Sequence, residues 1–551
     1  MNKIRIISAV LTLILSASSV LSLTSCAVRR VPNDEGGNTP NGSGDTGEDN
    51  SSTDEGKTDT DKASDPTDGL TPSEGLEFEI LTDEKGEDYA VLKGNGECKD
   101  RRIVIPKTYN DVPVKEIAEK AFYRKNNVMS VVIPNTVERI GNNAFWIAPL
   151  LSDVVLGNGV KYIGENAFCN LLGLKEITVP DSVTYIGNNA FSGCPNLSKV
   201  ILPDNLEGIG ENIVSSTAYY NDPSNWENGF LYYGKYLLAS NSGEIQGICT
   251  VKDGTKIIAG YVFADNEKLE GVIFPDSVEY IGSRAFYNSR SVAYITLPKS
   301  LKIIEGGAFS VCWSVKELVI PEGVTYIGPS AFSYAGLTSV TLPNTLTCIG
   351  GGAFEHTSIT EIILPDSLVT IEGQAFEGCK KLTKVVCGSS LKSIGIDAFN
   401  GCTALNDITL CSGITDFGSN IFTNTAFYNN EENWEDGALY IGEYLIKTSA
   451  SGDLVVKDGT TVIAGHAIGG ATSVTLPDSV KHICKGAFFR CMDLKTISMT
   501  KSVIFIGAEA FEDCTAIKDI YYSGTEEDWN KMIVEPLDNE FFIYASRHFS
   551  E

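Results

Sequence analysis

Apolar and polar positions alternate along this chain in a pattern that recurs every 23 residues. The segment IGNNAF stands at Ile140–Phe145 and again at Ile186–Phe191, with IGENAF midway at Ile163–Phe168. Its phenylalanine position recurs in sixteen registers, fourteen of them Phe, mostly 22 or 23 residues apart. The registers hold Phe122, Phe145, Phe168, Phe191, Val214, Phe263, Phe286, Phe309, Phe332, Phe354, Phe376, Phe399, Phe422, Ile468, Phe488 and Phe511. A fixed period of this length is typical of repeat architectures.

One repeat predicts one short strand and a compact turn. In LSKVILPDNLEGIGENIV, Val200 and Leu202 alternate with Lys199 and Ile201, which is the period of a strand with one buried face. Pro203 follows and ends the strand, because proline cannot donate to a ladder. The Ala-Phe pair and a small residue three positions later suit a short helical turn. One coil is too small to bury its apolar face alone, so stacked coils must share a core.

These motifs resemble a known repeat family. The pattern LxxVxLPxSVxxIGxxAFxxC, which covers Ile103 to Tyr522, resembles the leucine-rich repeats of BspA-like bacterial surface proteins. Tyr89–Phe122 resembles the entry cap of that family, and Ile520–Met532 resembles its closing segment. The resemblance implies a curved solenoid with a stacked parallel β-sheet and short helical or irregular turns. It implies no catalytic activity, because the family has no shared active site.

Two gaps between registers divide the array into blocks. TAYYNDPSNWENGFLYYGKYLL from Thr217 aligns with TAFYNNEENWEDGALYIGEYLI from Thr425, at an offset of 208 residues. Each gap therefore holds one divergent coil, near 217–255 and 425–460, which brings the expected total to 16–18 coils of 22–23 residues. We expect an N-terminal cap with the first coil at 76–122, the solenoid at 123–522 and a C-terminal cap at 523–551.

The N-terminus predicts export and anchoring. Residues 1–25 carry Lys3 and Arg5, an apolar run and the sequence LTS before Cys26, which resembles a bacterial lipoprotein signal peptide with Cys26 as the lipidated residue. A retained membrane helix or a simple secretory peptide is the alternative. Residues 26–75 are mostly acidic and small polar residues, a composition that predicts a disordered acidic tether. The chain is thus expected to be lipid-anchored to the bacterial envelope and exposed at the cell surface.

Composition excludes several classes of partner and chemistry. The formal net charge of −28 should repel nucleic acid and anionic headgroups, so the membrane is contacted only through the lipid anchor. The four histidines, His356, His466, His482 and His548, have no metal-ligand or triad spacing. No catalytic motif occurs, so we expect no enzyme, no metal and no cofactor.

The fourteen cysteines predict packing rather than cross-linking. Six of them stand three residues after the phenylalanine position: Cys194, Cys312, Cys379, Cys402, Cys491 and Cys514. Other registers hold mostly alanine, serine or threonine there, so the position favours a small buried side chain. A regular disulfide ladder between successive coils is the alternative.

Candidate binding residues fall into two groups. The outward strand positions include Thr178, Ile201, Ile273, Thr296, Val319, Thr341, Ile363, Thr409 and Thr475. The divergent coils add Tyr219, Tyr220, Trp226, Phe427, Tyr428 and Trp434. The competing interpretations are that β-branched residues simply favour strands, and that the aromatics only staple their loops to the adjacent coil.

These features together predict a non-enzymatic, surface-anchored adhesion or ligand-binding protein. Its expected partner is an extracellular protein or glycan, because long solenoid surfaces serve recognition. The alternatives are a structural envelope scaffold without a ligand, and a lipoprotein that captures glycans. The last alternative needs a concave pocket lined with aromatic residues, which the repeat pattern alone does not predict.

Overall fold

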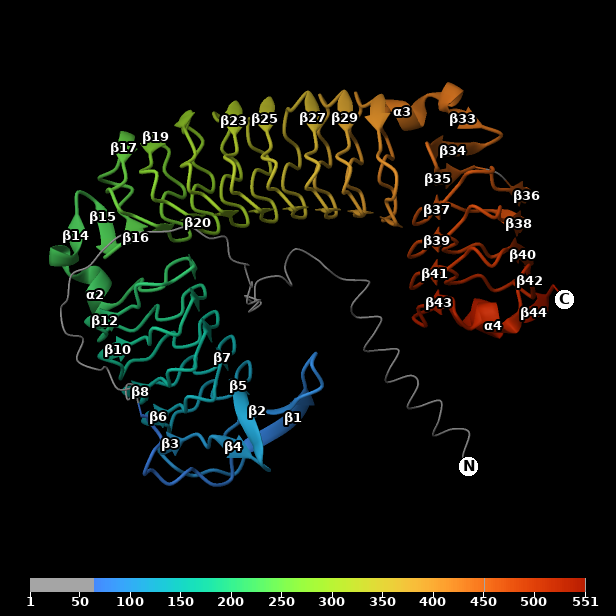
Figure 1. The fold of residues 1–551 in the computed structure, drawn as a ribbon. Helices are drawn as coiled ribbons and strands as arrows, with labels where there is room; N and C mark the ends of the chain where they lie inside the picture. Colours follow the sequence, from blue (N-terminus) through green and yellow to red (C-terminus); the bar gives the residue numbers. More distant parts are fainter. Residues whose placement is uncertain (1–63, 450, 551) are drawn as a thin grey trace, which may run out of the picture.

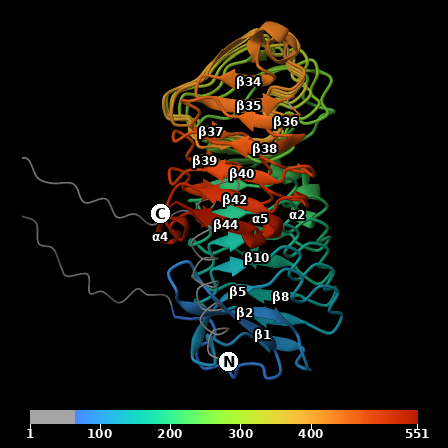
Figure 2. The ribbon, with the colours of Figure 1, turned by 90° about the vertical axis from the view of Figure 1, so that its right-hand side faces the viewer.

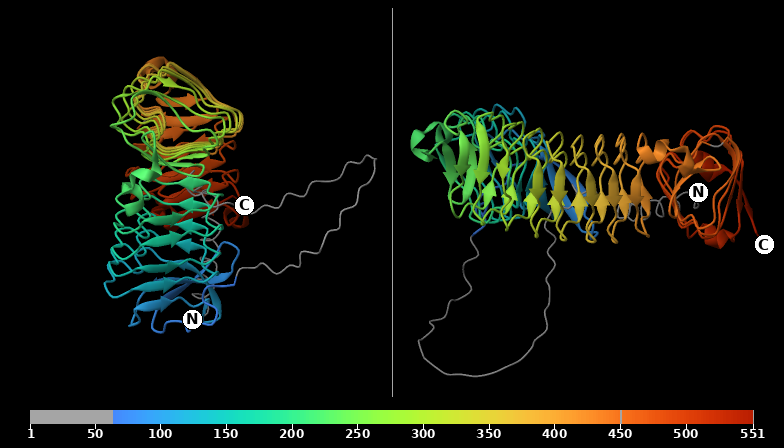
Figure 3. Two further views of the ribbon diagram at one scale, coloured as in Figure 1. Left: turned by 90° about the vertical axis from the view of Figure 1, so that its left-hand side faces the viewer. Right: turned by 90° about the horizontal axis from the view of Figure 1, so that it is seen from above.

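The chain folds into a solenoid whose coils stack into a horseshoe of three straight arms (Figure 1). The computed structural model describes residues 64–449 and 451–550. The first arm spans residues 64–216, the middle arm 217–424 and the last arm 425–550, and the stack turns where the two divergent coils stand. Figures 2 and 3 show from the sides and from above that the strands lie across the stacking direction.

A series of short parallel sheets follows the predicted strands and forms one layer on the convex side of the horseshoe (Figure 1). We call it the outer sheet. In the first arm it comprises β3 (Arg102–Val104), β6 (Ser130–Val132), β8 (Asp153–Val155), β10 (Glu176–Thr178) and β12 (Lys199–Ile201). In the middle arm it comprises β17 (Gly247–Thr250), β19 (Leu269–Ile273), β21 (Tyr294–Ile295), β23 (Glu317–Val319), β25 (Ser339–Thr341), β27 (Glu361–Ile363), β29 (Lys384–Val386) and β31 (Asp407–Thr409). In the last arm it comprises β36 (Gly452–Val455), β38 (Ala471–Thr475), β40 (Thr496–Met499), β42 (Asp519–Tyr522) and β44 (Ser546–Phe549).

A second parallel sheet, the inner sheet, lines the concave side (Figure 1) and is built from the residues just before the repeated glycine. In the first arm it comprises β5 (Val112–Ile117), β7 (Arg139–Ile140), β9 (Tyr162–Ile163), β11 (Tyr185–Ile186) and β13 (Gly208–Ile209). In the middle arm it comprises β18 (Ile257–Ile258), β20 (Tyr280–Ile281), β22 (Ile303–Ile304), β24 (Tyr326–Ile327), β26 (Cys348–Ile349), β28 (Thr370–Ile371), β30 (Ser393–Ile394) and β32 (Asp416–Phe417). In the last arm it comprises β37 (Val462–Ile463), β39 (His482–Ile483), β41 (Phe505–Ile506) and β43 (Ile533–Val534).

The third side of each coil is a hydrogen-bonded turn rather than the expected helical one. Residues two before and two after the phenylalanine position have positive φ in every register, as at Asn143 (φ 58°) and Ile147 (φ 57°). With positive φ at these two positions, three N–H groups of each coil point toward the next coil. One of them is the Phe145 N–H, which donates to the Ala167 carbonyl at 2.8 Å. The turns thereby form a ladder of their own.

The phenylalanines form a column through the core. Phe286, Phe309 and Phe332 are buried, and their rings stack with centroids 4.9 and 5.4 Å apart. The glycine that usually follows the inner strand needs no positive φ, but a Cβ on Gly141 would lie 2.6 Å from the Glu119 nitrogen. Close approach of the preceding coil, not backbone conformation, therefore favours glycine there.

The ends of the stack are closed by caps. At the N-terminus, β1 (Glu77–Thr82) and β2 (Asp88–Gly94) form a hairpin, β2 pairs with β5, and β4 (Thr108–Tyr109) pairs antiparallel to β5. At the C-terminus, α4 (Glu526–Trp529) and α5 (Glu540–Tyr544) cover the last coil. Phe542 stacks on Phe511 at 4.3 Å and so continues the phenylalanine column.

Part of the predicted tether is ordered. The sequence assigns residues 26–75 to a disordered segment, but 64–75 pack against the first coils. The Asp65 carboxylate accepts a hydrogen bond from the Asn135 N–H at 2.9 Å, and the Ser73 N–H donates to the Val104 carbonyl at 2.9 Å. The expectation failed there because a short polar segment obtained its order from the neighbouring coils. The signal peptide, Cys26 and the rest of the tether lie outside the described residues.

Candidate ligand-binding surface

In most coils, the residue at or just after the end of the outer strand points to solvent. These residues form a long row on the convex side, which we call the outer row. Its members are aliphatic residues and threonines: Val155, Thr178, Ile201, Ile273, Thr296, Val319, Thr341, Ile363, Thr409, Val455 and Thr475. All of them are exposed. The structure thus places the five predicted threonines on one surface, with Thr296 directly after its strand and the other four within strands.

The outer row is most apolar in the middle arm. The exposed fractions of Ile273, Val319 and Ile363 are 56%, 66% and 67%. The first residue of each strand forms a neighbouring polar row, which includes Glu176, Glu317 and Glu361. Neighbouring strands lie about 4.8 Å apart, so the two rows together present a regular, ribbed surface.

The divergent coils form the corners of the horseshoe. In the first, α2 (Ala218–Asn221) and the 3-10 turn η2 (Pro223–Asn225) lead into β14 (Trp226–Glu227), β15 (Phe230–Tyr233) and β16 (Tyr236–Ser240). The second repeats this as α3 (Ala426–Asn429), η3 (Glu431–Asn433), β33 (Trp434–Glu435), β34 (Ala438–Ile441) and β35 (Tyr444–Thr448). The hairpin of β15 and β16 stands between β13 and β18 and so interrupts the inner sheet. The coils on its two sides still pair through an isolated β-bridge between Glu211 and Gly260. Each insert is therefore a wedge that turns the stack.

A buried tyrosine fastens each insert to the coil before it. The Tyr236 hydroxyl donates to the Pro203 carbonyl at 2.8 Å and accepts from the Leu206 N–H at 3.0 Å. Tyr444 repeats the contact in the second corner by donating to the Cys411 carbonyl at 2.7 Å. Burial raises the pKa of Tyr236 to about 12. The repeat pattern alone did not point to these tyrosines, although the duplicated YGKYLL and IGEYLI segments preserve them.

The six predicted aromatic residues of the inserts lie half-buried against the solenoid core: Tyr219, Tyr220, Trp226, Phe427, Tyr428 and Trp434. The Trp226 indole N–H donates to the Tyr220 carbonyl at 2.7 Å, and the two rings meet edge to face with centroids 5.1 Å apart. Trp434 and Tyr428 repeat this arrangement at 2.8 and 5.3 Å. These contacts favour a stapling role over an open recognition site.

The six register cysteines are buried free thiols, and none forms a disulfide ladder. Their position is also a hydrogen-bonding one, which the sequence analysis missed. The Cys312 thiol donates to the Phe286 carbonyl of the preceding coil at 3.0 Å, and Cys194 does the same toward Phe168 at 3.2 Å. Ser289 takes this role toward Phe263 in another register, so the position selects a small S–H or O–H donor.

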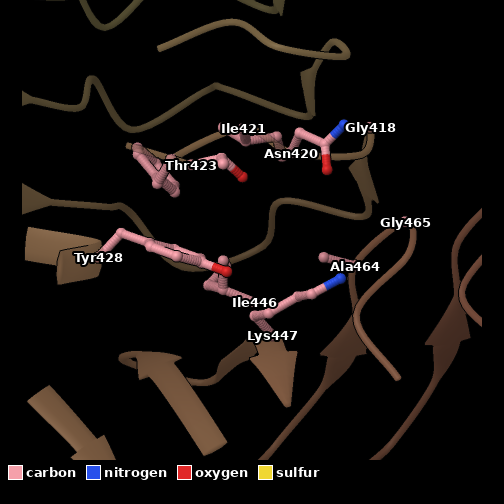
Figure 4. A pocket seen from close by; sticks show the side chains of 10 residues that line it. Gly418, Asn420, Ile421, Thr423, Tyr428, Ile446, Lys447, Ala464 and Gly465 are labelled. Carbon is pink, nitrogen blue, oxygen red and sulfur yellow. The ribbon is translucent and has the colours of Figure 1, made fainter. Parts of the chain in front are cut away.

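An enclosed space at the second corner is too small for a ligand. Figure 4 shows Lys447 and the ring of Tyr428 on its walls. The space inside is about 10 Å³, which holds roughly one water molecule. The Lys447 ammonium donates to the His466 carbonyl at 2.6 Å, and burial lowers the pKa of Lys447.

Residues 64–449 and 451–550 contain neither a candidate metal site nor a candidate membrane span. No group of three or more His, Cys, Asp or Glu side chains could hold a metal ion in this part of the chain. No helix among the same residues is long and apolar enough to span a membrane.

The repeat units match a known family model. The model for the BspA type leucine rich repeat region matches residues 115–224, 240–350, 325–451 and 466–533, which is more than half of the chain. This chain belongs to the BspA-type leucine-rich-repeat family. The resemblance expected from the sequence motifs is thereby confirmed at the level of the family and its solenoid fold.

Solved bacterial leucine-rich-repeat proteins are similar to this chain. A protein from Bacteroides ovatus is 21% identical, covers 88% of this chain and 100% of its own length, and has a TM-score of 0.27. A leucine rich cell surface protein from Faecalibacterium prausnitzii is 23% identical over 83% and 95% of the two chains, with a TM-score of 0.24. A Bacteroides capillosus protein is 32% identical over 23% and 98% of the two chains, with a TM-score of 0.21. The comparison with curated proteins gives no match.

Proposed function

We propose that this chain is a non-enzymatic recognition protein of the bacterial cell surface, and that its outer sheet binds an extracellular protein. The observation that carries the proposal is the outer row, a line of mostly exposed β-branched side chains in which Val319 and Ile363 are 66% and 67% exposed. Contiguous exposed apolar surface is uncommon on monomeric proteins and is typical of interaction sites.

The remaining surfaces fit recognition better than catalysis. The enclosed space at the second corner holds about 10 Å³, and the described histidines do not gather into a site. The corner inserts are fastened by their own hydrogen bonds, such as that from Trp226 to Tyr220. A structural scaffold without a ligand would also use a rigid stack, but it would not need the aliphatic members of the outer row to face solvent.

Export and anchoring belong to the same proposal. The lipoprotein-like sequence that ends at Cys26 would place the solenoid outside the membrane on an acidic tether. The description of the similar Faecalibacterium prausnitzii protein as a cell surface protein supports this location. An outer sheet on the convex side of an anchored horseshoe would be accessible to large ligands.

The test compares two triple variants of the full chain on an array of extracellular matrix proteins and glycans. The variant Ile273→Ser, Val319→Ser and Ile363→Ser removes aliphatic surface from the outer row. We expect it to lose at least tenfold in affinity for the bound protein, with unchanged circular dichroism. Equal affinity of this variant and the native chain would overturn the proposal.

The matched control changes three exposed aliphatic residues that lie outside the outer sheet: Leu172→Ser, Ile396→Ser and Ile504→Ser. Their exposed fractions are 53%, 50% and 51%, so the control removes a comparable amount of apolar surface. We expect its affinity to match that of the native chain. Loss of binding in the control alone would assign recognition to another face.

Glycan capture on the inner sheet is the second candidate function. The concave side supplies aromatic residues that the repeat pattern did not reveal: Tyr162 and Tyr185 stack at 5.2 Å, and the Arg139 guanidinium lies 4.1 Å from the Tyr162 ring centre. Aromatic faces are suited to sugar rings. If Tyr162→Ala abolishes binding to a glycan on the array while the outer-row variant does not, this candidate replaces the first.

A further inference from the structure

The outer sheet of the middle arm places an apolar row beside a row that carries carboxylates. Ile273, Thr296, Val319, Thr341 and Ile363 follow one another along the outer row. Beside them the polar row reads Tyr294, Glu317, Ser339 and Glu361, all exposed. We call these nine residues the middle patch.

The two carboxylates of the middle patch take part in no ion pair among the described residues. Among the ion pairs of the described residues, none involves Glu317 or Glu361, whereas Glu176 in the first arm lies 3.1 Å from the Lys199 ammonium. At the far end of the middle arm, Asp407 lies 2.9 Å from Lys384. Lys384 is also registered with Glu361 on the neighbouring strand. One lysine thus stands between two carboxylates, and the row keeps a net negative charge at the middle patch.

The spacing of the carboxylates sets the geometry of a partner. Glu317 and Glu361 stand two strands apart, because β23 pairs with β25 and β27 is the next outer strand. Two strand spacings amount to about 9.6 Å. A polyproline II segment rises about 3.1 Å per residue and turns once in three residues. Every third side chain of such a segment therefore recurs on one face after about 9.3 Å, close to the carboxylate spacing.

We propose that the middle patch binds an extended protein segment that carries a basic residue at every third position and apolar residues between them. This rests on the proposed function, because it assigns a partner class to the outer sheet. The basic side chains meet Glu317 and Glu361, and the apolar side chains lie on Val319, Thr341 and Ile363. Charge steers the encounter, whereas the exposed aliphatic row supplies buried area.

The test uses a fluorescein-labelled peptide with six Lys-Pro-Val repeats and the full chain, followed by fluorescence anisotropy at 50 and 300 mM NaCl. We expect saturable binding that weakens with salt, and no binding of a Glu-Pro-Val peptide of equal length. The double variant Glu317→Lys and Glu361→Lys should weaken binding at least tenfold. A Lys-Pro-Val peptide that does not bind would overturn the proposal.

A matched charge control separates the patch from general acidity. Glu165 and Glu207 are exposed and lie in the first arm, outside the outer sheet. The variant Glu165→Lys and Glu207→Lys changes the net charge equally, and we expect it to bind the peptide like the native chain. Equal weakening in both double variants would overturn the site. If the array ligand depends on the outer row but Glu317→Lys and Glu361→Lys leave its binding unchanged, the partner class is wrong and the proposed function stands.

A separate observation concerns two cysteines at the outer edge of the last coils of the middle arm. Cys387 and Cys411 are half-buried free thiols, and their sulfur atoms lie 2.8 Å apart. The positions 208 residues earlier hold Val179 and Pro203. The coil therefore occurs in both blocks of the duplication, whereas the cysteine pair occurs only in the second block.

The backbone geometry suits a covalent link between these thiols. Val386 is registered with Thr409 in adjacent parallel strands, so Cys387 and Cys411 are one residue out of register. Strand spacing and one residue rise give a Cα separation of about 6 Å, inside the range of about 4.4–6.8 Å that disulfides span. The register cysteines differ, because their buried thiols donate to backbone carbonyls.

We infer that Cys387 and Cys411 form a modification site that closes to a disulfide by exchange with a small-molecule disulfide. One thiolate attacks the small disulfide, which forms a mixed disulfide and releases one small thiol. The second cysteine then attacks the protein sulfur of this mixed disulfide, which forms the Cys387–Cys411 bond and releases the second small thiol. The two electrons and the two protons of the protein thiols end on the small thiols.

Treatment of the full chain with oxidised glutathione, alkylation of the remaining thiols and peptide mass spectrometry test this site. We expect a cross-linked peptide that joins Cys387 to Cys411, and a stable glutathione adduct on the remaining cysteine of either Cys387→Ser or Cys411→Ser. Cys249, which is half-buried without a cysteine contact among the described residues, is the internal control and should form only a mixed adduct. A native chain in which both cysteines stay alkylated thiols would overturn the inference.

Discussion

The buried tyrosine at the first corner provides a sharp test of how the inserts hold the arms together. In Tyr236→Phe the ring stays and only the hydroxyl is lost. The residue is 1% exposed, so no bulk water replaces the hydroxyl, and the Pro203 carbonyl and the Leu206 N–H both lose their partner. An unsatisfied buried polar group costs about 1–3 kcal/mol. We therefore expect the free energy of unfolding to fall by about 2–4 kcal/mol.

Urea denaturation followed by circular dichroism measures this loss. Tyr294→Phe is the control, because Tyr294 is 65% exposed on the outer sheet and its change should cost less than about 0.5 kcal/mol. Equal midpoints for the two variants would refute the idea that the hydroxyl clamps the corner.

The same hydroxyl predicts the sign of a pH effect. Burial raises the pKa of Tyr236 to about 12 from an ordinary value of 10.0. The unfolded chain therefore ionises first, and the stability contributed by this group is complete below about pH 10 and lost as pH rises toward 12. Tyr236→Phe should show a smaller fall in stability over this window than the native chain, and an equal fall would contradict the assignment.

The remaining predictions concern core, anchor and inserts. Phe309→Ala should lower the free energy of unfolding by about 3–5 kcal/mol, because the ring is buried between two others, whereas the exposed Thr341→Ala should cost under about 1 kcal/mol; similar urea midpoints would show that the register is wrong. Metabolic labelling with a fatty-acid analogue should mark the native chain but not Cys26→Ala, and a labelled variant would remove the lipoprotein assignment. Trp226→Ala and Trp434→Ala should each lower the free energy of unfolding by about 2 kcal/mol and leave the ligand affinity of the folded protein unchanged. If cells that carry the folded double variant adhere more weakly, the inserts are part of the binding site.

The repeat could be predicted from the sequence because every coil packs the same kinds of side chain at the same positions. The phenylalanine column and the alternation of Val200 with Ile201 follow from a period that hydrophobic burial imposes on every coil. Two features were beyond the pattern. The inner strands are only two residues long, as at Tyr162–Ile163, which is too short for a visible alternation. The positive φ values beside Phe145 belong to residues as different as Asn143 and Ile147, so composition gives no signal for them.

The candidate site was predictable in part. Thr178 and Thr341 could be placed outward because the strand period fixes which side chains leave the core. That the outer sheet would be convex could not be predicted, because curvature depends on how thick each side of a coil is and on the wedges at the corners. The hydrogen bond from Trp226 to the Tyr220 carbonyl could not be predicted either, because an aromatic residue in a polar loop can serve stapling or recognition.

Hydroxyl-radical footprinting of the full chain, with and without the protein that it binds on the matrix array, tests the central claim most directly. The method reports side-chain accessibility, and Ile273, Tyr294, Val319 and Ile363 are all at least half exposed in the free structure. We predict that the ligand protects these four residues while Leu172, which lies outside the outer sheet, reacts unchanged. Protection confined to the inner sheet or the corner inserts, with the outer row still fully reactive, would contradict the claim that the outer sheet is the recognition surface.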